Sequence, residues 1–525
     1  MRSKNGIRII VLLIMIIFLA LGLFQLSGIE TTFAENIVED NSMCIEAEID
    51  GERFQIKSWL DQESQIYKFF IPNYLNENID IRFKESAKTE CVFLSEIPSV
   101  YIELRTGTLD EIRQDKADEE KIYFSVFSEE GLKTNRKKGS IHARGNASFS
   151  APRYKKSYTV DLNEADSIEN MAVSSKWVLL AHYYDDTHLR DYLTFDIARL
   201  LEMQYVPNGK FINLYIDGEF QGLYFLCEKI EIATDKINIR NLEQITEKKS
   251  PGQAIKEFPY SIEGIRGGEN IDVEKGYMVD DVASDISGGY LLEIEWLTDR
   301  YNEENSGFVS DKNQKVIIKS PQYASYSEVE YIKNRYQEFE DALNRSISND
   351  TDEYIEYIEL QSFVNKYLIE EVSKNMDANF SSQYLYKDSD EKDARFYAGP
   401  VWDYDRAYDN KVSEENRGAD IFWVNQAKAG TDFWQRLWNA PRFSECVKET
   451  YREKLSPILN LYSKEKIWEW EEEIHNSIIA DMYRYRDEYD EKMDEEKRLL
   501  REMEMLSQFI EERKIFLDKE WGNNE

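Results

Sequence analysis

The hydrophobic pattern of this 525-residue chain changes its period near Tyr326. Before that point, short apolar or alternating segments such as "YTVDL" and "GGYLLEIEW" lie between turn residues, as β-strands do. After it, apolar residues recur at steps of three and four, which is the period of an amphipathic α-helix. Strand-rich segments followed by helical ones predict an α+β fold. With 42% hydrophobic residues, a chain of this length can bury a large core in two or three structural units.

The same pattern divides the chain into predicted units. After a leader at 1–34, these are a small β-rich module at 35–96, a strand-rich lobe at 97–231, a polar insertion or linker at 232–286, a second lobe at 287–460 and a charged helical extension at 461–525. Asp217 and Gly218 stand between two apolar strands, which predicts a tight two-residue hairpin turn.

An apolar stripe runs along the charged extension at helical spacing. Its members are Ile467, Trp470, Ile474, Ile478 and Met482. Such a stripe predicts that the helix packs against the body of the protein, and a surface for a partner is the alternative.

The leader has the pattern of an export signal. Three basic residues precede an uninterrupted apolar run from Ile9 to Phe24, and small residues allow cleavage after Ala34. A run of this length also suits an uncleaved membrane anchor. In both cases we expect the body of the protein to lie outside the cytoplasm, in contact with a membrane only through this segment if it is uncleaved.

The composition excludes several classes of function. The chain carries 65 basic and 101 acidic residues, and a net charge of -36 repels the phosphates of nucleic acids. Only four cysteines and four histidines are present, too few and too scattered for a zinc centre or a cysteine or serine hydrolase triad. Cys44 and Cys91 flank the small module and predict either one disulfide or two unpaired thiols.

Carboxylates follow an apolar run in "YAGPVWDYDRAYDN", at positions 397 to 410. Asp403 and Asp405 stand where the second of two short predicted strands ends, and Asp377 follows a predicted helix, "LQSFVNKYLIEEVSKN". In phosphoryl-transfer sites one carboxylate accepts the proton of the acceptor hydroxyl and another binds Mg²⁺. The order of these residues predicts such a site, and a solvated acidic turn is the alternative.

An upstream loop has the composition of a phosphate-binding loop. In "IHARGNASFSAPRYKKSYTVDL", the residues Arg144, Gly145 and Asn146 lie between two predicted strands, and Lys155 and Lys156 open the second strand. Small residues let backbone N–H groups approach phosphates, and a lysine supplies a positive charge. A surface hairpin with solvated lysines is the alternative.

Together these segments resemble the spore-coat protein H (CotH) kinase family. The resemblance extends from about Ile97 to Phe443 and also includes "WVLLAHYYDDTHLRDYLTFDIARLL", "YIDGEFQGLYFLCEKI" and "SFVNKYLIEEVSKNMDANFSSQYLYKD". It implies an atypical protein-kinase-like fold in two lobes, which binds ATP with Mg²⁺ or Mn²⁺ and phosphorylates serine or threonine of protein substrates.

The resemblance also implies the nucleotide-binding residues. Arg144, Gly145 and Asn146 match the loop that covers the phosphates. Lys156 matches the phosphate-contacting lysine, and Lys155 is the second choice because neighbouring residues of a strand point to opposite faces. Glu228 matches a glutamate at a strand end near the adenine or ribose, with a salt bridge at the hinge as the alternative.

The catalytic and metal-binding residues are implied in the same way. Asp377 matches the catalytic aspartate and Asp403 the metal-binding one, whereas Asp405 is either a second ligand or a support for Arg406. Ser382 stands where classical protein kinases have a metal-binding asparagine, so the sequence leaves a second metal open.

A further block of the family, "W…D…LR", predicts a structural support. It corresponds to Trp177, Asp186, Leu189 and Arg190. We expect the aspartate and the arginine to pair at a helix start and fix the lobe.

The expected function is therefore that of an exported kinase. Its substrate would be a surface or spore-coat protein, basic and serine-rich because the acidic surface attracts such proteins. The alternative is a non-catalytic structural or adhesion protein that binds partners through the kinase-like cleft or the N-terminal module.

Overall fold

The computed structural model describes most of the chain. The described residues are 44–75, 79–80, 88–145, 147–150, 155–249, 255–279, 282–426, 430–489 and 492–522. The predicted leader lies outside them. Within these ranges, no helix is both long and apolar enough to cross a membrane. Strands dominate the first half of the chain and helices the second, so the predicted α+β class is confirmed.

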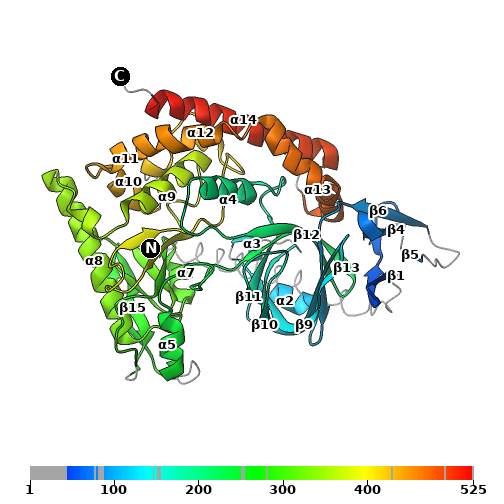
Figure 1. The fold of residues 1–525 in the computed structure, drawn as a ribbon, viewed down its shortest axis with the longest axis horizontal. Helices are drawn as coiled ribbons and strands as arrows, with labels where there is room; N and C mark the ends of the chain where they lie inside the picture. Colours follow the sequence, from blue (N-terminus) through cyan, green and yellow to red (C-terminus); the bar gives the residue numbers. More distant parts are fainter. Residues whose placement is uncertain are drawn as a thin grey trace, which may run out of the picture.

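A closed seven-stranded barrel forms the first large unit, which we call the barrel lobe (Figure 1). Its order is β10-β11-β13-β12-β7-β8-β9. The strands are β7 (Ser99–Leu104), β8 (Glu119–Ser128), β9 (Gly131–Arg144), β10 (Ser157–Asp166), β11 (Ser174–Leu180), β12 (Gly209–Ile216) and β13 (Glu219–Glu228). Alternate side chains fill its interior, where Tyr158, Trp177 and Tyr224 are fully buried. Two short helices, α2 (Leu109–Gln114) and α3 (Ala147–Ser150), lie between its strands.

The predicted hairpin turn joins β12 to β13. Asp217 has a φ of 49° and Gly218 a φ of 84°. Left-handed φ values at both central residues are what a tight two-residue turn between twisted strands requires, so this prediction is confirmed.

The N-terminal module packs against the barrel as two three-stranded sheets. Their orders are β2-β1-β5 and β3-β4-β6. The strands are β1 (Cys44–Ile49), β2 (Glu52–Lys57), β3 (Trp59–Asp61), β4 (Ile66–Pro72), β5 (Ile79–Asp80) and β6 (Thr89–Leu94). Phe54 anchors the module through ring contacts with Tyr101 and Phe127 of the barrel, at centroid distances of 5.3 and 5.0 Å. Cys91 carries a free thiol, so the disulfide with Cys44 is not formed.

A seven-stranded antiparallel sheet forms the base of the second large unit, which we call the helical lobe. Its order is β14-β15-β17-β18-β16-β19-β20. The strands are β14 (Pro259–Arg266), β15 (Glu269–Tyr277), β16 (Tyr290–Glu295), β17 (Gly307–Val309), β18 (Lys315–Ser320), β19 (Gln383–Lys387) and β20 (Phe396–Ala398). Residues 232–286, predicted as an insertion or linker, supply the hairpin β14–β15 and the helix α5 (Leu242–Lys249). Most side chains of β14 are exposed or half-buried, which is why this strand has no clear hydrophobic alternation.

Helices cover one face of this sheet. The helices α8 (Tyr326–Asn349) and α9 (Leu360–Ser373) contact its strands, and α10 (Phe433–Trp438) and α11 (Phe443–Thr450) pack against these two helices. The short helix α12 (Ser456–Leu459) follows them in the chain. The predicted helix over "LQSFVNKYLIEEVSKN" is thus confirmed as α9. A capping box of Ser325 and Glu328 begins α8, and Lys374 in the left-handed region ends α9. The helix α4 (Arg190–Leu200) follows the barrel strand β11 and packs against α9, so it connects the two lobes.

Two long helices near the C-terminus, α13 (Lys464–Arg484) and α14 (Glu495–Trp521), extend across both lobes (Figure 1). All members of the predicted apolar stripe of α13 are buried, which confirms that this helix packs onto the body. The backbone N–H of Leu223 in β13 donates to Asp481 Oδ1 at 3.0 Å, and Nζ of Lys155 lies 2.6 Å from the same oxygen. The α13 helix is therefore held on the barrel by a buried carboxylate.

The helix α14 is held on the helical lobe by a buried arginine. Nη2 of Arg513 lies 2.7 Å from Glu371 Oε1 in α9, and Nη1 donates to the carbonyls of Ala419 and Ile421, both at 2.7 Å. The same glutamate accepts the backbone N–H groups of Trp423 and Val424. The C-terminal helix thus ties α9 to the segment 419–424.

The pair of Lys155 and Asp481 leads to a stability prediction. Asp481→Ala leaves a buried ammonium group without its counter-charge, and we expect the free energy of unfolding to fall by about 3–5 kcal/mol. Chemical denaturation measures this change. In the double variant Lys155→Met/Asp481→Leu neither charge of the pair remains, so part of the loss is recovered, while the backbone N–H of Leu223 still lacks its acceptor. Asp487→Ala, at an exposed position just beyond α13, is the matched control. An equal effect of Asp481→Ala and Asp487→Ala would contradict the prediction.

Candidate functional site

Asp377 lies in the turn that follows α9. Its backbone N–H donates to Asn375 Oδ1 at 3.0 Å, and Asn375 Nδ2 donates to Glu370 Oε2 at 2.8 Å. Because Asn375 and Glu370 are both fully buried, these bonds fix the turn to the helix. The carboxylate of Asp377 itself stays partly exposed, with 19% of its side chain accessible.

Asp403 lies in a loop and not at the end of a strand as predicted. The strand β20 ends at Ala398, and the buried residues Val401 and Trp402 anchor the loop before Asp403. Asp403 has a φ of 71°, a left-handed conformation that costs free energy for a residue with a side chain. The hydroxyl of Ser382 donates to Asp403 Oδ2 at 3.0 Å and orients the carboxylate.

The pKa values of three aspartates of the site are raised. Desolvation raises the pKa of Asp403 to about 6, and the charges of Asp377 and Asp191 add to this effect. Desolvation also raises the pKa of Asp377. The pKa of Asp405 is raised well above its usual value by desolvation and by the neighbouring charge of Asp403. Such a group of carboxylates is stabilised by a proton or by a bound cation.

Arg406 is the ion-pair partner of the predicted catalytic residue. Its Nη1 lies 3.5 Å from Asp377 Oδ1, and its guanidinium lies 5.8 Å from the ring centroid of Tyr184. Asp405 forms no ion pair with Arg406 within the described ranges, so the structure gives no contact for the alternative in which Asp405 supports Arg406.

A second layer of polar groups holds the loop between the two aspartates. The backbone N–H of Tyr404 donates to Asp191 Oδ1 at 2.7 Å, and the other oxygen of Asp191 lies 3.1 Å from His182 Nε2. The hydroxyl of Tyr404 donates to Glu370 Oε1 at 2.6 Å. The sequence analysis missed Asp191, although it directly follows Arg190 of the "W…D…LR" block.

The predicted phosphate loop lies close to this carboxylate loop. Arg144 ends β9, and its guanidinium lies 5.2 Å from the ring centroid of Trp402, the residue before Asp403. Gly145 has a φ of 97°, which favours glycine. Asn146 lies outside the described residues. The two regions of the sequence that carry the family resemblance therefore meet between the lobes.

The two neighbouring lysines point to different surroundings. Nζ of Lys156 donates to the carbonyl of Phe149 in α3 at 2.5 Å and lies 5.2 Å from the centroid of that ring. Nζ of Lys155 instead donates to the carbonyl of Leu223 at 2.9 Å, beside Asp481. Contact of Lys156 with a nucleotide phosphate stays a prediction.

Glu228 is fully buried at the end of β13. Its carboxylate accepts the backbone N–H of Asn208 at 3.0 Å, the hydroxyl of Tyr205 at 3.1 Å and the backbone N–H of Ala172 at 3.1 Å. These bonds fix the strand end to two loops. They give the glutamate a supporting position, whereas its contact with a nucleotide stays a prediction.

The predicted ion pair of an aspartate with Arg190 at a helix start is present, but its aspartate is Asp185 and not the predicted Asp186. Arg190, the first residue of α4, forms a buried ion pair with Asp185, whose Oδ2 also accepts the backbone N–H of Arg190 at 2.9 Å. Asp186 lies near Lys411 and Arg498 instead, at 3.6 and 3.7 Å. Trp177 and Leu189 are fully buried, as a structural role requires.

The donor set fits Mg²⁺ bound together with phosphate. Across the part of the chain that is described, no group of three or more His, Cys, Asp or Glu side chains is arranged to hold a metal by itself. Mg²⁺ needs only one or two carboxylates, because phosphate oxygens and water complete its octahedron. Asp403 and Asp405, with their raised pKa values, can supply these carboxylates.

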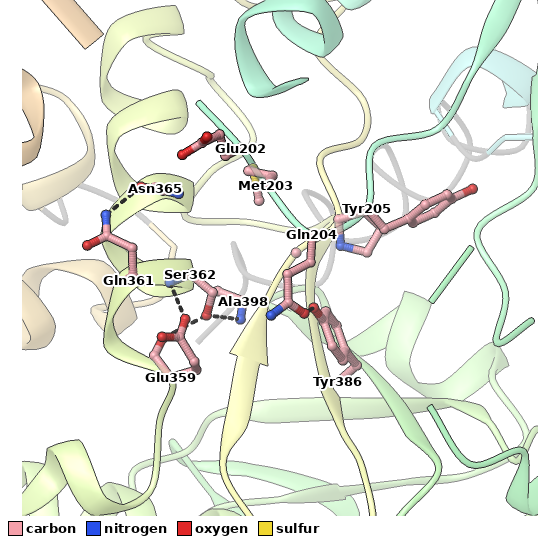
Figure 2. A pocket seen from close by; sticks show the side chains of 12 residues that line it. Glu202, Met203, Gln204, Tyr205, Glu359, Gln361, Ser362, Asn365, Tyr386 and Ala398 are labelled. Carbon is pink, nitrogen blue, oxygen red and sulfur yellow. Dashed lines mark hydrogen bonds between the residues drawn. The ribbon is translucent and has the colours of Figure 1, made fainter. Parts of the chain in front are cut away.

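A cavity of about 220 Å³ lies at the other end of α9 (Figure 2). Its lining includes Glu359 and Ser362 at the start of the helix, Tyr205 and Tyr386. A helix of 14 residues is about 21 Å long, so this cavity and Asp377 lie at opposite ends of α9. No lysine or arginine is among its described lining residues, so the cavity does not suit phosphate.

The raised pKa of Asp403 leads to a prediction about stability and pH. The folded protein binds this proton more tightly than the unfolded chain, so the contribution to stability is present below about pH 4 and is lost as the pH rises through about 6. At about 1.4 kcal/mol for each pH unit between 3.8 and about 6, the loss is about 3 kcal/mol.

Asp403→Asn removes this charge. Without divalent cations, we expect the variant to be more stable than the wild type at pH 8 by up to this amount and equally stable at pH 4. Urea denaturation at both pH values measures the difference, with the exposed Asp235→Asn as control. A difference that is the same at pH 4 and pH 8 would contradict the prediction.

Comparison with known proteins agrees with the resemblance in the sequence. The family described as "CotH kinase protein" matches residues 141–517, which is most of the chain and includes α13 and nearly all of α14. A search among curated proteins finds no match. The match extends further towards the C-terminus than the motifs of the sequence, which end near Phe443. The chain belongs to the CotH kinase family.

Proposed function

We propose that the protein is an exported, atypical serine/threonine kinase with two kinase-like lobes, which transfers the terminal phosphate of ATP to a protein substrate. One observation carries the proposal. Asp377 and Asp403 come from separate segments and lie within electrostatic reach of each other, and Arg144 of the predicted phosphate loop lies against Trp402, the residue before Asp403. Membership of the CotH kinase family supports the same chemistry.

Asp377 would act as the general base. Its raised pKa makes it a better proton acceptor than an ordinary aspartate, and the ion pair with Arg406 at 3.5 Å orients it. The hydroxyl of the substrate attacks the terminal phosphorus of ATP, the bond from that phosphorus to the bridging oxygen breaks, and the hydroxyl proton moves to Asp377.

Asp403 and Asp405 would hold Mg²⁺ or Mn²⁺. When bound, such an ion neutralises negative charge on the phosphates. Ser382 fixes the direction of the Asp403 carboxylate, and Asp191 fixes the backbone of Tyr404 between the two ligands.

The barrel lobe would bind the nucleotide. Arg144, Gly145 and Asn146 would cover the phosphates, as in the related kinases, with Lys156 as the phosphate lysine and Glu228 near the adenine or ribose. Arg144 supports this assignment because it lies beside the carboxylate loop.

The substrate would be a basic, serine-containing protein of the cell envelope or spore coat. The net charge of -36 attracts such proteins and speeds their encounter with the site. The leader would carry the kinase out of the cytoplasm.

The activity prediction compares two aspartate variants. With labelled ATP, Mg²⁺ and a basic, serine-rich acceptor protein, we expect Asp403→Ala to lose at least about 10³-fold in the rate of phosphate transfer, because a lost metal ligand removes several kcal/mol of charge stabilisation. The exposed Asp235→Ala keeps the wild-type rate. Mg²⁺ with ATP raises the melting temperature of the wild type and not that of Asp403→Ala.

The non-catalytic alternative predicts the opposite result. A wild-type protein that neither transfers phosphate nor gains thermal stability from Mg²⁺ and nucleotide is no kinase. Unchanged binding of a surface protein by Asp377→Ala and Asp403→Ala would then support a structural or adhesion role.

A separate prediction concerns cleavage of the predicted export signal. We expect the protein recovered from outside the cytoplasm to have the mass of a chain that begins at Glu35, because the small residues before that position suit a signal peptidase. Mass spectrometry of the intact exported protein measures this. The full-length mass in a membrane fraction would show an anchor instead.

A further inference from the structure

Arg300 lies beside the carboxylate site and was not recognised in the sequence. It belongs to α7 (Thr298–Glu303), which follows β16 in the interior of the seven-stranded sheet. The side chain of Arg300 is 25% accessible, so part of it is exposed to solvent. It is therefore placed to contact a bound ligand.

Two glutamates form ion pairs with Arg300. Its Nη1 lies 3.2 Å from Glu295 Oε2, and its Nη2 lies 3.7 Å from Glu293 Oε1. Neither contact has hydrogen-bond geometry, and Arg300 makes no hydrogen bond within the part of the chain that the structure describes. The buried Glu295 Oε2 likewise has no hydrogen-bond partner there. A guanidinium group has five N–H donors, so those of Arg300 are available to an anion.

A short series of contacts connects Arg300 with the predicted metal ligand. Glu293 Oε1, which faces Arg300, accepts the backbone N–H of Ser382 at 3.2 Å. The hydroxyl of the same serine donates to Asp403 Oδ2 at 3.0 Å. Arg300 is thus fixed relative to Asp403 through two residues.

The charge of Arg300 acts on both functional aspartates. It lowers the pKa of Asp377 and that of Asp403 against the effect of desolvation, and Asp403 in turn raises the pKa of Arg300. The guanidinium therefore lies within electrostatic reach of the predicted base and of the predicted metal ligand.

The other two arginines of the site have different contacts. Arg406 is paired with Asp377, and Arg144 lies against the ring of Trp402. Arg300 combines two acidic supports with unused donors and closeness to both aspartates. In phosphoryl transfer, the reacting phosphorus lies between the base and the metal ligand.

We propose that Arg300 binds the terminal phosphate of ATP and stabilises the charge on the phosphoryl group during its transfer. This inference rests on the proposed kinase function. The planar guanidinium can bind two phosphate oxygens at once, which a lysine cannot do. Glu293 and Glu295 hold the side chain in place before the nucleotide binds.

A binding experiment tests the contact without measuring turnover. The melting temperatures of the full-length wild type and Arg300→Gln are compared with Mg²⁺ and ADP, and with Mg²⁺ and the β,γ-imido analogue of ATP. We expect the wild type to gain more stability from the analogue than from ADP. Arg300→Gln keeps the rise in melting temperature with ADP. It loses most of the further rise that the analogue gives over ADP, because only the analogue carries a terminal phosphate.

Arg266→Gln is the matched control. Arg266 has similar exposure, 32%, donates a hydrogen bond to Asp311 Oδ1 at 3.3 Å and lies on the edge strand β14. We expect this variant to behave as the wild type in both measurements.

Steady-state kinetics test the role in transfer. We expect kcat of Arg300→Gln to fall by about 10²–10³-fold, as on loss of a donor to a developing charge, with KM for ATP changed less than about fivefold. The kcat of Arg300→Lys stays far below that of the wild type, because lysine lacks the planar guanidinium group that can bind two phosphate oxygens.

The outcomes separate the two proposals. If no nucleotide stabilises the wild type, the kinase function and this inference both fail. If the wild type binds and transfers phosphate but Arg300→Gln keeps the additional shift and the wild-type kcat, only the role of Arg300 fails. A raised KM with unchanged kcat would also overturn its role in transfer.

Discussion

Mutual repulsion among carboxylates is the constraint on which the candidate site depends. The charges of Asp377 and Asp191 add to the desolvation that raises the pKa of Asp403, and the charge of Asp403 adds to the desolvation that raises the pKa of Asp405, an arrangement that costs free energy in the absence of a cation. Hydrogen bonds from the surrounding fold hold these carboxylates in position. Asn375 accepts the backbone N–H of Asp377, the hydroxyl of Ser382 donates to Asp403, and Asp191 accepts the backbone N–H of Tyr404. Strain and charge are concentrated where binding of a metal and a nucleotide would relieve them.

The two lobes are joined by buried polar contacts as well as by apolar packing. Lys155 of the barrel lobe meets Asp481 of α13, and Glu371 of α9 meets Arg513 of α14. Each pair lies in the interior, where a missing partner leaves an uncompensated charge. The first pair holds the barrel lobe to α13 and the second holds the helical lobe to α14, and these two helices pack against each other.

Local patterns in the sequence predicted local structure well. The turn at Asp217 and Gly218, the helix α9 and the burial of the α13 stripe follow from residue types and spacing within a few turns of the chain. The sequence also indicated Asp377 and Asp403, through their order along the chain and the family resemblance.

The sequence could not choose between neighbours or find distant partners. Asp185 and Asp186 are adjacent and chemically identical, and only the approach of Arg190 decides which one pairs with it. Arg300 has no motif of its own, because its position depends on the register of β16 within the sheet and on Ser382 from another segment. The hairpin β14–β15 was predicted as a linker because an exposed edge strand lacks the apolar alternation by which strands are recognised.

The contacts of Arg513 have a consequence for the order in which the fold is completed during synthesis. The segment 419–424, which follows the loop of Asp403 and Asp405, is held on α9 by Arg513, which belongs to α14 and is made after the rest of the candidate site. A chain whose synthesis has not yet reached α14 therefore lacks these contacts, even when every predicted site residue has already been made. The helix that carries Glu371 and the segment 419–424 therefore reach these contacts only after α14 is in place.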